Sequence, residues 1–367
     1  MGIEEFIKRL HEYTIKALDI KFIDRDNEVK RLLELLSYKP ITMPILVGPV
    51  GCGKSEFIKA FTYASKELIG EYVTIYLDLR EGGVIASLEP GVRDYIRSMI
   101  SREFKNILDI PVKIHRLFRD MGTRMYIRGR SMIIFLDELK YYSRERDLLY
   151  SFISELSSRI YNIIEDVNLK EFHPIAVLND QYVIQMLLRD RSRKISIYLM
   201  WNLDIDNSIK LLEKFNVKMD IDTIWQLTGG NISEILAIIR YKNDIRRYIS
   251  SKLRACESIY AYARDIGVED YLARIVYNID YLKPYMTDLE LPEYRLTKFL
   301  YDQNIVITVD SRIEYLSNIP TDEPWIGNIN AFQIPAYYWC LKTLIESRSY
   351  EAKPDMVMKM MREYIKK

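Results

Sequence analysis

The feature that most constrains the fold is a glycine-rich loop, GPVGCGKS, at residues 48–55, between an apolar run and a helical pattern. In such a loop the backbone N–H groups from residue 51 to 55 can point into one concavity, and the N-terminus of the following helix adds partial positive charge. Glycines let the backbone close around a ligand without Cβ clashes. The segment therefore predicts a phosphate cradle, formed by Gly48, Pro49, Val50, Gly51, Cys52, Gly53, Lys54 and Ser55.

Two side chains of this loop have expected roles toward a nucleoside triphosphate. Lys54 would reach the β- and γ-phosphates, and the hydroxyl of Ser55 would hold Mg²⁺. Cys52 is expected to be a small side chain that faces away from the phosphates.

A second element of the same chemistry is the apolar run at 132–136, which ends in Asp137 and Glu138. Asp137 would orient Mg²⁺ opposite Ser55, and Glu138 would accept a proton from the attacking water or orient it. The alternative is a strand that merely ends in a solvated acidic pair. Coupling to the glycine-rich loop makes that alternative the weaker one.

The spacing of apolar runs predicts an α/β fold with five strands. The runs lie at 41–47, 72–79, 132–136, 174–178 and 195–199, and helical patterns separate them at 55–68, 91–108, 148–165 and 181–188. This alternation is typical of a parallel sheet covered by helices on both faces. The run at 72–79 is an extra strand that lies, in sequence, between the loop strand and the acidic strand. Together with Glu138, such a strand is typical of the hydrolysing branch of P-loop proteins.

Two further residues are candidates at the same edge of the sheet. The strand at 175–178 ends in Asn179 and Asp180, and Asn179 would contact the γ-phosphate or the water; the equal alternative is a cap for the helix that follows. Arg191, in a basic cluster at 188–194, would answer the triphosphate charge in cis or from a neighbouring subunit, against the alternative of a solvated surface run.

The N-terminal segment at 22–28 is a candidate base-binding box. Phe22 and Ile23 would pack on an adenine ring, while Arg25 and Glu28 would brace the loop around it. The alternative is an ordinary helix start, with Asp24 or Asp26 as the cap.

After residue 204 the pattern changes to short amphipathic helices. The turn Thr228-Gly229-Gly230-Asn231 is expected to cap a helix at 232–241. From about 257, helices lead to two short runs at 304–309 and 312–316 that predict a β-hairpin and, with it, a winged-helix-like module. We expect an ATPase domain at 1–204, a helical lid at 205–254, the winged-helix-like domain at 255–320 and a helical extension at 321–367.

Charge and composition limit the partners. The 367 residues carry a net charge of +1, so no global field attracts nucleic acid. Basic residues at 246–254 fit a solvated helix face better than a nucleic-acid contact. The helix before the predicted hairpin is nearly neutral, which favours protein–protein or intramolecular docking over DNA readout. Three distant cysteines and no membrane-spanning run fit a cytoplasmic protein, and the oligomeric state is open.

These elements, in this order, resemble the archaeal branch of the STAND NTPases, which are relatives of the AAA+ class. That family opens with F-x-G-R-x-x-E, in which Asp24 here replaces the glycine, and continues with G-P-x-x-x-G-K-[ST] and the acidic pair. Of its G-R motif only the arginine is matched, by Arg191, because Asp190 replaces the glycine. Its T-G-G-N-P turn is matched at the first four positions, and Ile232 replaces the proline. The family ends in a winged helix.

The resemblance implies binding of ATP with Mg²⁺, slow hydrolysis, and a switch in which the C-terminal domains close over ATP or ADP and act on a protein partner. The phosphate-sensing histidine of some such switches is missing here, and Ile232 removes the usual proline contact of the lid.

One rival is a DNA-binding AAA+ protein like the origin-recognition initiators, which share this domain order. Another is a nucleotide-binding scaffold without turnover, against which the intact Lys54, Asp137 and Glu138 argue.

Overall fold

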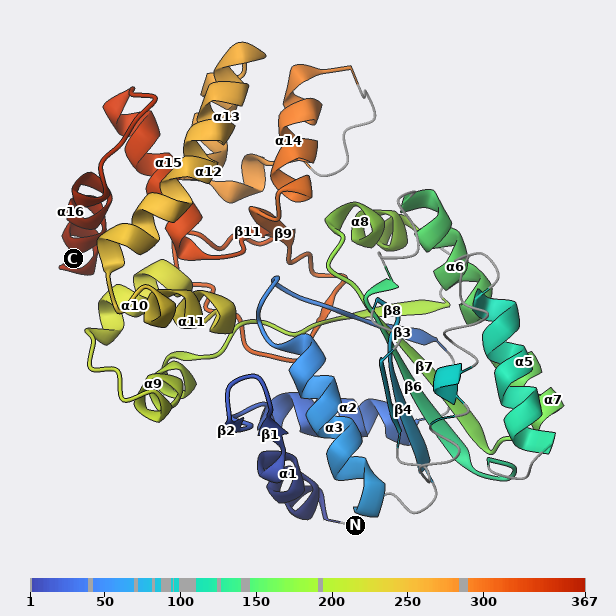
Figure 1. The fold of residues 1–367 in the computed structure, drawn as a ribbon. Helices are drawn as coiled ribbons and strands as arrows, with labels where there is room; N and C mark the ends of the chain where they lie inside the picture. The colour runs from blue at the N-terminus through green and yellow to red at the C-terminus, as the bar shows by residue number, and fades with distance from the viewer. Residues whose placement is uncertain are drawn as a thin grey trace. The chain divides into compact units, whose positions relative to one another are not determined.

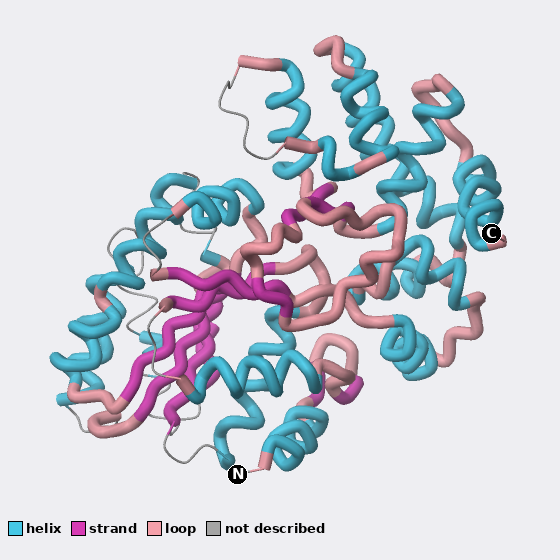
Figure 2. Tube along the Cα trace, turned by 180° about the vertical axis from the view of Figure 1, so that it is seen from behind, coloured by secondary structure: helices cyan, strands magenta, loops and turns pink. Residues whose placement is uncertain are grey.

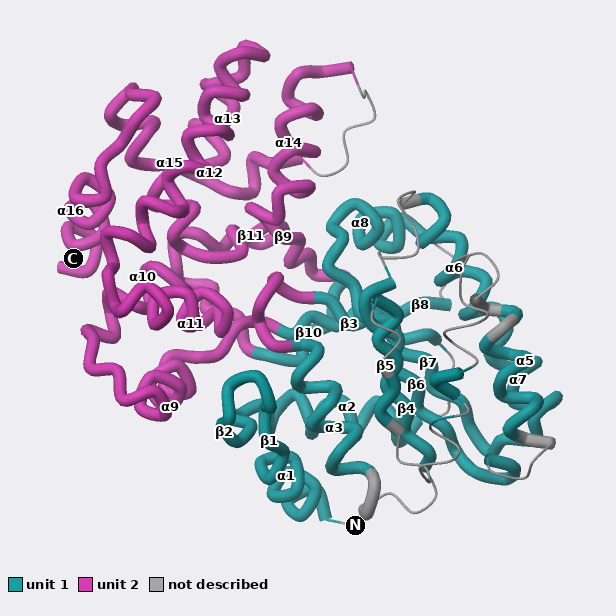
Figure 3. Tube along the Cα trace, in the orientation of Figure 1, with its two compact units in different colours: residues 1–47, 54–200, 313–317 teal, residues 48–53, 201–312, 318–367 magenta. Residues whose placement is uncertain are grey.

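The computed structural model describes residues 2–38, 42–68, 72–80, 83–86, 94, 96–98, 110–123, 127–139, 146–190, 194–283 and 290–366. Contacts within the chain divide it into two compact units (Figure 3). Unit 1 comprises residues 1–47, 54–200 and 313–317, and unit 2 comprises residues 48–53, 201–312 and 318–367.

Unit 1 is built on a seven-stranded sheet in the order β10-β8-β3-β7-β6-β4-β5, whose central strands are labelled in Figure 1. All neighbours pair in parallel except β4 and β5. The five predicted strands are all present, and β7 lies between β3 and β6. The strands are β3 (Met43–Val47), β4 (Tyr72–Asp78), β5 (Gly83–Ala86), β6 (Ser131–Asp137), β7 (Glu171–Val177), β8 (Ile195–Leu199) and β10 (Glu314–Tyr315).

Helices cover both faces of this sheet (Figure 2). One group is α1 (Ile3–Glu12), α2 (Asp26–Ser37) and α3 (Lys54–Leu68), beside the small hairpin β1 (Thr14–Ile15) and β2 (Ile20–Lys21). The other is α5 (Ile110–Thr123), α6 (Arg146–Ser158), α7 (Ile160–Val167) and α8 (Gln181–Arg189). The helix predicted at 148–165 is thus two helices that meet at Arg159. The helix predicted at 91–108 falls almost wholly outside the described residues.

Aromatic packing fixes α3, the helix that follows the glycine-rich loop, on the sheet. The ring of Phe61 lies 4.8 Å from that of Phe6 on α1 and 5.7 Å, edge-on, from that of Phe135 on β6. The ring of Phe57 lies 6.3 Å from that of Phe61. All four phenylalanine side chains are buried. Each such ring buries a large apolar area, so the start of α3 is held rigidly relative to β6.

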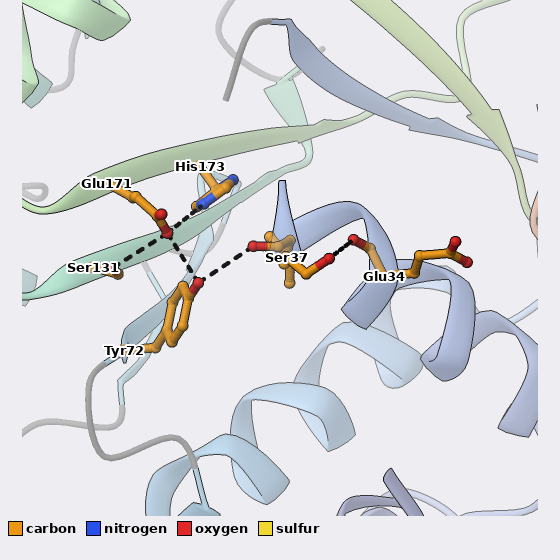
Figure 4. A network of polar contacts seen from close by, with 7 residues as sticks. Glu34, Ser37, Tyr72, Ser131, Glu171 and His173 are labelled. Atoms are coloured by element: carbon orange, nitrogen blue, oxygen red, sulfur yellow. Dashed lines mark hydrogen bonds and ion pairs between the residues drawn. The ribbon is translucent and has the colours of Figure 1, made fainter. Parts of the chain in front are cut away.

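A polar network ties together the starting ends of β4, β6 and β7, at the edge opposite the carboxyl ends (Figure 4). Glu171 accepts hydrogen bonds from Tyr72 (2.9 Å) and Ser131 (3.4 Å), and His173 lies 3.4 Å from the same carboxylate oxygen. Burial lowers the pKa of His173. The network satisfies polar groups that the sheet would otherwise bury unpaired, which is a structural role.

Unit 2 is mainly helical. Its helices α12 (Ile245–Asp265) and α15 (Pro335–Ser347) pack along each other, and Trp325 and Trp339 are both buried. The elements are α9 (Ile205–Lys214), α10 (Ile221–Thr228), α11 (Ile232–Arg240), α12 (Ile245–Asp265), α13 (Glu269–Tyr277), η3 (Ile279–Tyr281), α14 (Pro292–Asp302), β9 (Val306–Thr308), β11 (Asn330–Phe332), α15 (Pro335–Ser347) and α16 (Pro354–Ile365).

The hairpin predicted from residues 304–309 and 312–316 does not form. β9 pairs with β11 in antiparallel fashion, whereas residues 314–315 form β10, which joins the large sheet in parallel with β8. A tight hairpin needs positive φ angles at its turn, and neither Asp310 nor Ser311 has one. Instead Asp310 accepts hydrogen bonds from the backbone and the guanidinium of Arg312, which turns the chain toward β10.

No helix in the described part of the chain combines the length and apolar character needed to cross a bilayer.

Candidate functional site

The acidic pair lies at the carboxyl end of β6, where the sequence predicts it. Asp137 is buried, with 2% of its surface exposed. One of its oxygens accepts a hydrogen bond from the hydroxyl of Tyr76 (3.1 Å) and the other from the backbone N–H of Glu138 (2.9 Å). Both donors are neutral. A buried carboxylate held by neutral donors favours a cation as its further partner.

Glu138 has the geometry and electrostatics of a proton acceptor. Its φ angle is 57°, a left-handed conformation that is uncommon for a residue with a side chain and that concentrates at functional sites. Burial raises its pKa, and the negative charges of Asp137 and Asp78 raise it further, whereas Arg80 and Lys54 lower it. A glutamate with a raised pKa is a better base near neutral pH than an ordinary one.

Two groups at this edge could not be singled out from the sequence. Asp78 is the last residue of β4, and its register partner on β6 is Asp137. Tyr76, two positions earlier, orients the carboxylate of Asp137, and burial strongly raises the pKa of its phenol, so it remains a donor. The sequence does show an aspartate near the end of each of two predicted strands, Asp78 and Asp137. That observation becomes informative only when β4 and β6 are known to be neighbours.

Lys54 and Ser55 begin α3. Lys54 is buried, and its charge acts on Glu138, since it contributes to lowering the pKa of that carboxyl group. The structure therefore brings the predicted phosphate-binding lysine within electrostatic range of the predicted base.

For Asn179 the sequence left two roles open, a helix cap and a contact with the γ-phosphate or the water, and the structure gives the cap to Asp180. Asp180 is the cap of α8 and accepts hydrogen bonds from the backbone N–H groups of Tyr182 (3.1 Å) and Val183 (3.2 Å). Asn179 is not the cap, and its side-chain oxygen is buried without a hydrogen-bond partner in the described part of the chain. It follows β7, which lies between the loop strand and the acidic strand.

The N-terminal box forms a buried ion pair instead of a capped helix start. Arg25 donates to Glu28 at 2.7 Å, and the same oxygen accepts the hydroxyl of Ser317 at 2.6 Å. No side chain caps α2. Asp24 and Arg25 both have positive φ angles, 64° and 77°, which explains why a glycine is the usual residue at the first of these positions. Phe22 is buried and Ile23 is half-buried.

The rest of the glycine-rich loop, residues 48–53, belongs to unit 2, where its backbone is hydrogen-bonded to the turn at 228–231. The side-chain amide of Asn231 donates to the carbonyl of Val50 at 2.9 Å. Gly51, with φ 81°, lies so close to Ser233 that a Cβ there would come within 2.6 Å of it. These contacts make Gly51 obligatory for packing as well as for conformation.

The turn itself caps α11, as predicted. Asn231 accepts a hydrogen bond from the backbone N–H of Glu234. Gly230 has a φ of 77°, and a Cβ on it would lie 1.9 Å from the carbonyl oxygen of Leu203. No other residue fits there without moving the backbone.

The predicted Mg²⁺ ligands, the hydroxyl of Ser55 and the carboxylate of Asp137, are hard oxygen donors of the kind that Mg²⁺ prefers. Arg191 lies outside the described residues.

The basic residues of α12 are largely engaged within unit 2. Lys252 pairs with Glu234 at 2.6 Å and Arg246 with Asp355 at 2.9 Å, while the guanidinium of Arg247 stacks on the ring of Tyr241. This favours the interpretation of a solvated or internally paired face over a nucleic-acid contact.

A family model described as an ATPase domain predominantly from Archaea matches residues 22–238. Similar proteins include an uncharacterized ATP-binding protein of Pyrococcus horikoshii, 23% identical over 261 residues (63% of this chain and 78% of that protein). Another, from Methanocaldococcus jannaschii, is also described as an uncharacterized ATP-binding protein and is 24% identical over 283 residues (64% and 76%).

Among solved structures, the Aeropyrum pernix ORC2 protein in its ADPNP and ADP complexes aligns with a TM-score of 0.41 and 11% identity, over 91% of this chain and 99% of that one. AMPPCP-bound DnaA from Aquifex aeolicus aligns with a TM-score of 0.35 and 16% identity, over 80% and 97%. Likenesses this remote assign no function.

The buried ion pair of the N-terminal box yields a stability prediction. Replacing Arg25 with leucine leaves the carboxylate of Glu28 buried without its charged partner, so we expect a loss of about 3–5 kcal/mol in the free energy of unfolding. The measurement is urea denaturation. Arg31→Leu, on the exposed face of the same helix, is the matched control and should change stability by less than about 0.5 kcal/mol. Equal effects of the two substitutions would contradict the assignment.

Proposed function

Because this chain belongs to the family of ATPase domains found predominantly in Archaea, we propose that it binds ATP with Mg²⁺, hydrolyses it, and works as a STAND-type molecular switch. The observation that carries the proposal is the edge of the sheet where β6 ends. There Asp137 and Glu138 lie one strand away from β3, which leads into the glycine-rich loop, and the charge of Lys54 acts on Glu138. These are the groups that phosphoryl transfer to water requires.

The residues divide the chemistry among them. The loop amides and Lys54 bind the phosphates, while Ser55 and Asp137 hold Mg²⁺, which would neutralise charge on the phosphoryl oxygens. Glu138 accepts the proton of the attacking water, and the unpartnered oxygen of Asn179 orients that water by accepting from it. Phe22 and Ile23 contribute apolar surface for the adenine ring, and Arg191 is a candidate for charge stabilisation.

The switch component of the proposal concerns what nucleotide binding does to the remaining chain. Asn231 of the turn and Ser233 just after it donate hydrogen bonds to the loop, so a ligand that orders the loop also orders this segment. We propose an ATPase domain at 1–204, a lid at 205–254, a third domain at 255–320 that lacks the predicted winged-helix hairpin, and a helical extension at 321–367, with an unidentified protein as the partner.

Removing the proposed base should abolish turnover without abolishing ATP binding. Glu138→Gln keeps the size of the side chain and removes its basicity, so ATP should still bind while turnover falls by roughly 100-fold or more. Binding is measured by calorimetry and turnover by phosphate release. Glu165→Gln, an exposed position on α7, is the matched control and should behave like the wild type. Unchanged turnover in Glu138→Gln would rule out the role of Glu138.

The raised pKa of Glu138 predicts a pH dependence. As a base, Glu138 must be ionised, so kcat/KM should fall as the pH drops through its folded-state pKa, which lies above the usual value for glutamate. Asp78→Asn removes a negative neighbour, makes ionisation of Glu138 easier, and should shift this acid limb to lower pH. A limb that stays in place, or moves upward, would contradict the electrostatic assignment.

The rival function, DNA binding, requires a positive surface, but two basic residues around the predicted hairpin are neutralised by neighbouring carboxylates within unit 2. Lys298 on α14 pairs with Asp302 at 2.9 Å, and Arg312 with Asp310 at 2.7 Å. Turnover measured with and without duplex DNA separates the two functions. We expect equal rates, whereas stimulation by DNA with a steep salt dependence would favour the rival.

A further inference from the structure

Three residues of unit 2 hold the backbone of the glycine-rich loop by its polar groups. The carbonyl oxygens of Val50 and Gly51 accept hydrogen bonds from the side chain of Asn231 (2.9 Å) and the backbone N–H of Ser233 (3.2 Å). The backbone N–H of Val50 donates to Oε1 of Gln333 at 2.8 Å. These contacts fix the loop backbone through Val50 and the carbonyl of Gly51, and successive backbone amides in such a loop can bind an anion.

The contact with Val50 also determines which way the amide group of Gln333 faces. A backbone N–H can only donate, so the side-chain atom that meets it must be the oxygen. The nitrogen, Nε2, is therefore the remaining polar atom, and it lies beside the same loop. Gln333 is 3% exposed, and its Nε2 is buried without a hydrogen-bond partner among the described residues. A buried donor left unsatisfied costs free energy and indicates a missing acceptor.

The position of Gln333 is fixed by a closed set of hydrogen bonds. Its backbone carbonyl accepts from Nδ2 of Asn202 at 3.3 Å, and Oδ1 of Asn202 accepts from Asn231 at 2.9 Å. Asn231 in turn donates to Val50, which donates to Gln333. Asn202 and Asn231 are both buried, so the side chain of Gln333 is held in one orientation.

We propose that Gln333 is a nucleotide-binding residue, whose Nε2 donates a hydrogen bond to an oxygen of the β- or γ-phosphate of the nucleotide held by the loop. This rests on the proposed function. The missing acceptor lies beside a loop whose ligand is polyanionic, and a phosphate oxygen is the acceptor that such a ligand brings. Val50 precedes the amides expected to contact phosphate, so its bond to Gln333 and the binding of nucleotide are compatible.

The position of Gln333 gives this contact a consequence. The residue lies between β11 and α15, and α15 packs along α12. A phosphate that satisfies Nε2 strengthens the attachment of this connection to the loop, and by reciprocity the attached connection strengthens phosphate binding. Gln333 thus links the number of phosphates on the nucleotide to the helical core of unit 2.

The experiment compares two substitutions that remove the donor in different ways. Gln333→Glu keeps an acceptor for Val50 but places a carboxylate where Nε2 donates, and Gln333→Met removes both polar atoms at similar length. Affinities for AMP, ADP and ATP are measured by calorimetry. We expect both variants to bind ADP and ATP roughly tenfold or more weakly, Gln333→Glu most of all, while AMP affinity changes much less. Gln303→Glu, at an exposed position, is the control for added charge and should match the wild type.

The outcomes separate this proposal from the general one. Wild-type affinity in Gln333→Glu, with weak binding only in Gln333→Met, would assign Gln333 a purely structural bond to Val50 and overturn the proposal. Equal losses for AMP, ADP and ATP would do the same. Wild-type protein that binds no nucleotide would overturn the proposed function itself. Thermal unfolding without nucleotide checks that each variant folds, and if Gln333→Glu does not, the AMP-to-ADP comparison in Gln333→Met decides.

Discussion

The parallel arrangement of β3, β7 and β6 is the constraint on which the candidate site depends. Parallel strands place all their carboxyl ends at one edge, so three segments far apart in the chain deliver their terminal residues to the same place. Because β7 separates β3 from β6, Asn179 follows the strand between the loop strand and the acidic pair. Aromatic packing between α3 and β6 then keeps Lys54 at a fixed distance from this edge.

This edge carries an excess of negative charge that the stability of the fold does not require. Asp78, Asp137 and Glu138 gather there, and burial with mutual repulsion raises the pKa of Glu138. Like charges held together in a partly buried site reduce stability, and they are kept where a cation or a proton is to be bound. The opposite edge differs, since Tyr72, Ser131 and Glu171 satisfy one another there.

In the glycine-rich loop, local sequence determines the backbone conformation, whereas tertiary contacts determine which groups hold the backbone. Gly51 and Gly53 have positive φ angles, which glycine adopts without the steric cost of a Cβ. Which groups hold its backbone could not be predicted, because Gln333 contacts Val50 across 283 positions of sequence and carries no recognisable motif. The failed hairpin has the same cause. The alternating pattern at 312–316 fits any strand, and only the free edge of β8 decided its partner.

The sequence by itself determined the phosphate loop, the acidic pair, the five main strands and the helix cap at Asn231, because each depends on local rules of conformation or on residue chemistry at short spacing. Tertiary structure alone decided the assignment of the cap to Asp180 and not Asn179, the burial of Arg25 against Glu28, the presence of Asp78 and Tyr76 beside Asp137, and the hydrogen bonds from Asn231 and Gln333 to the loop. These depend on which polar groups meet once elements pack, and burial then requires each group to find a partner.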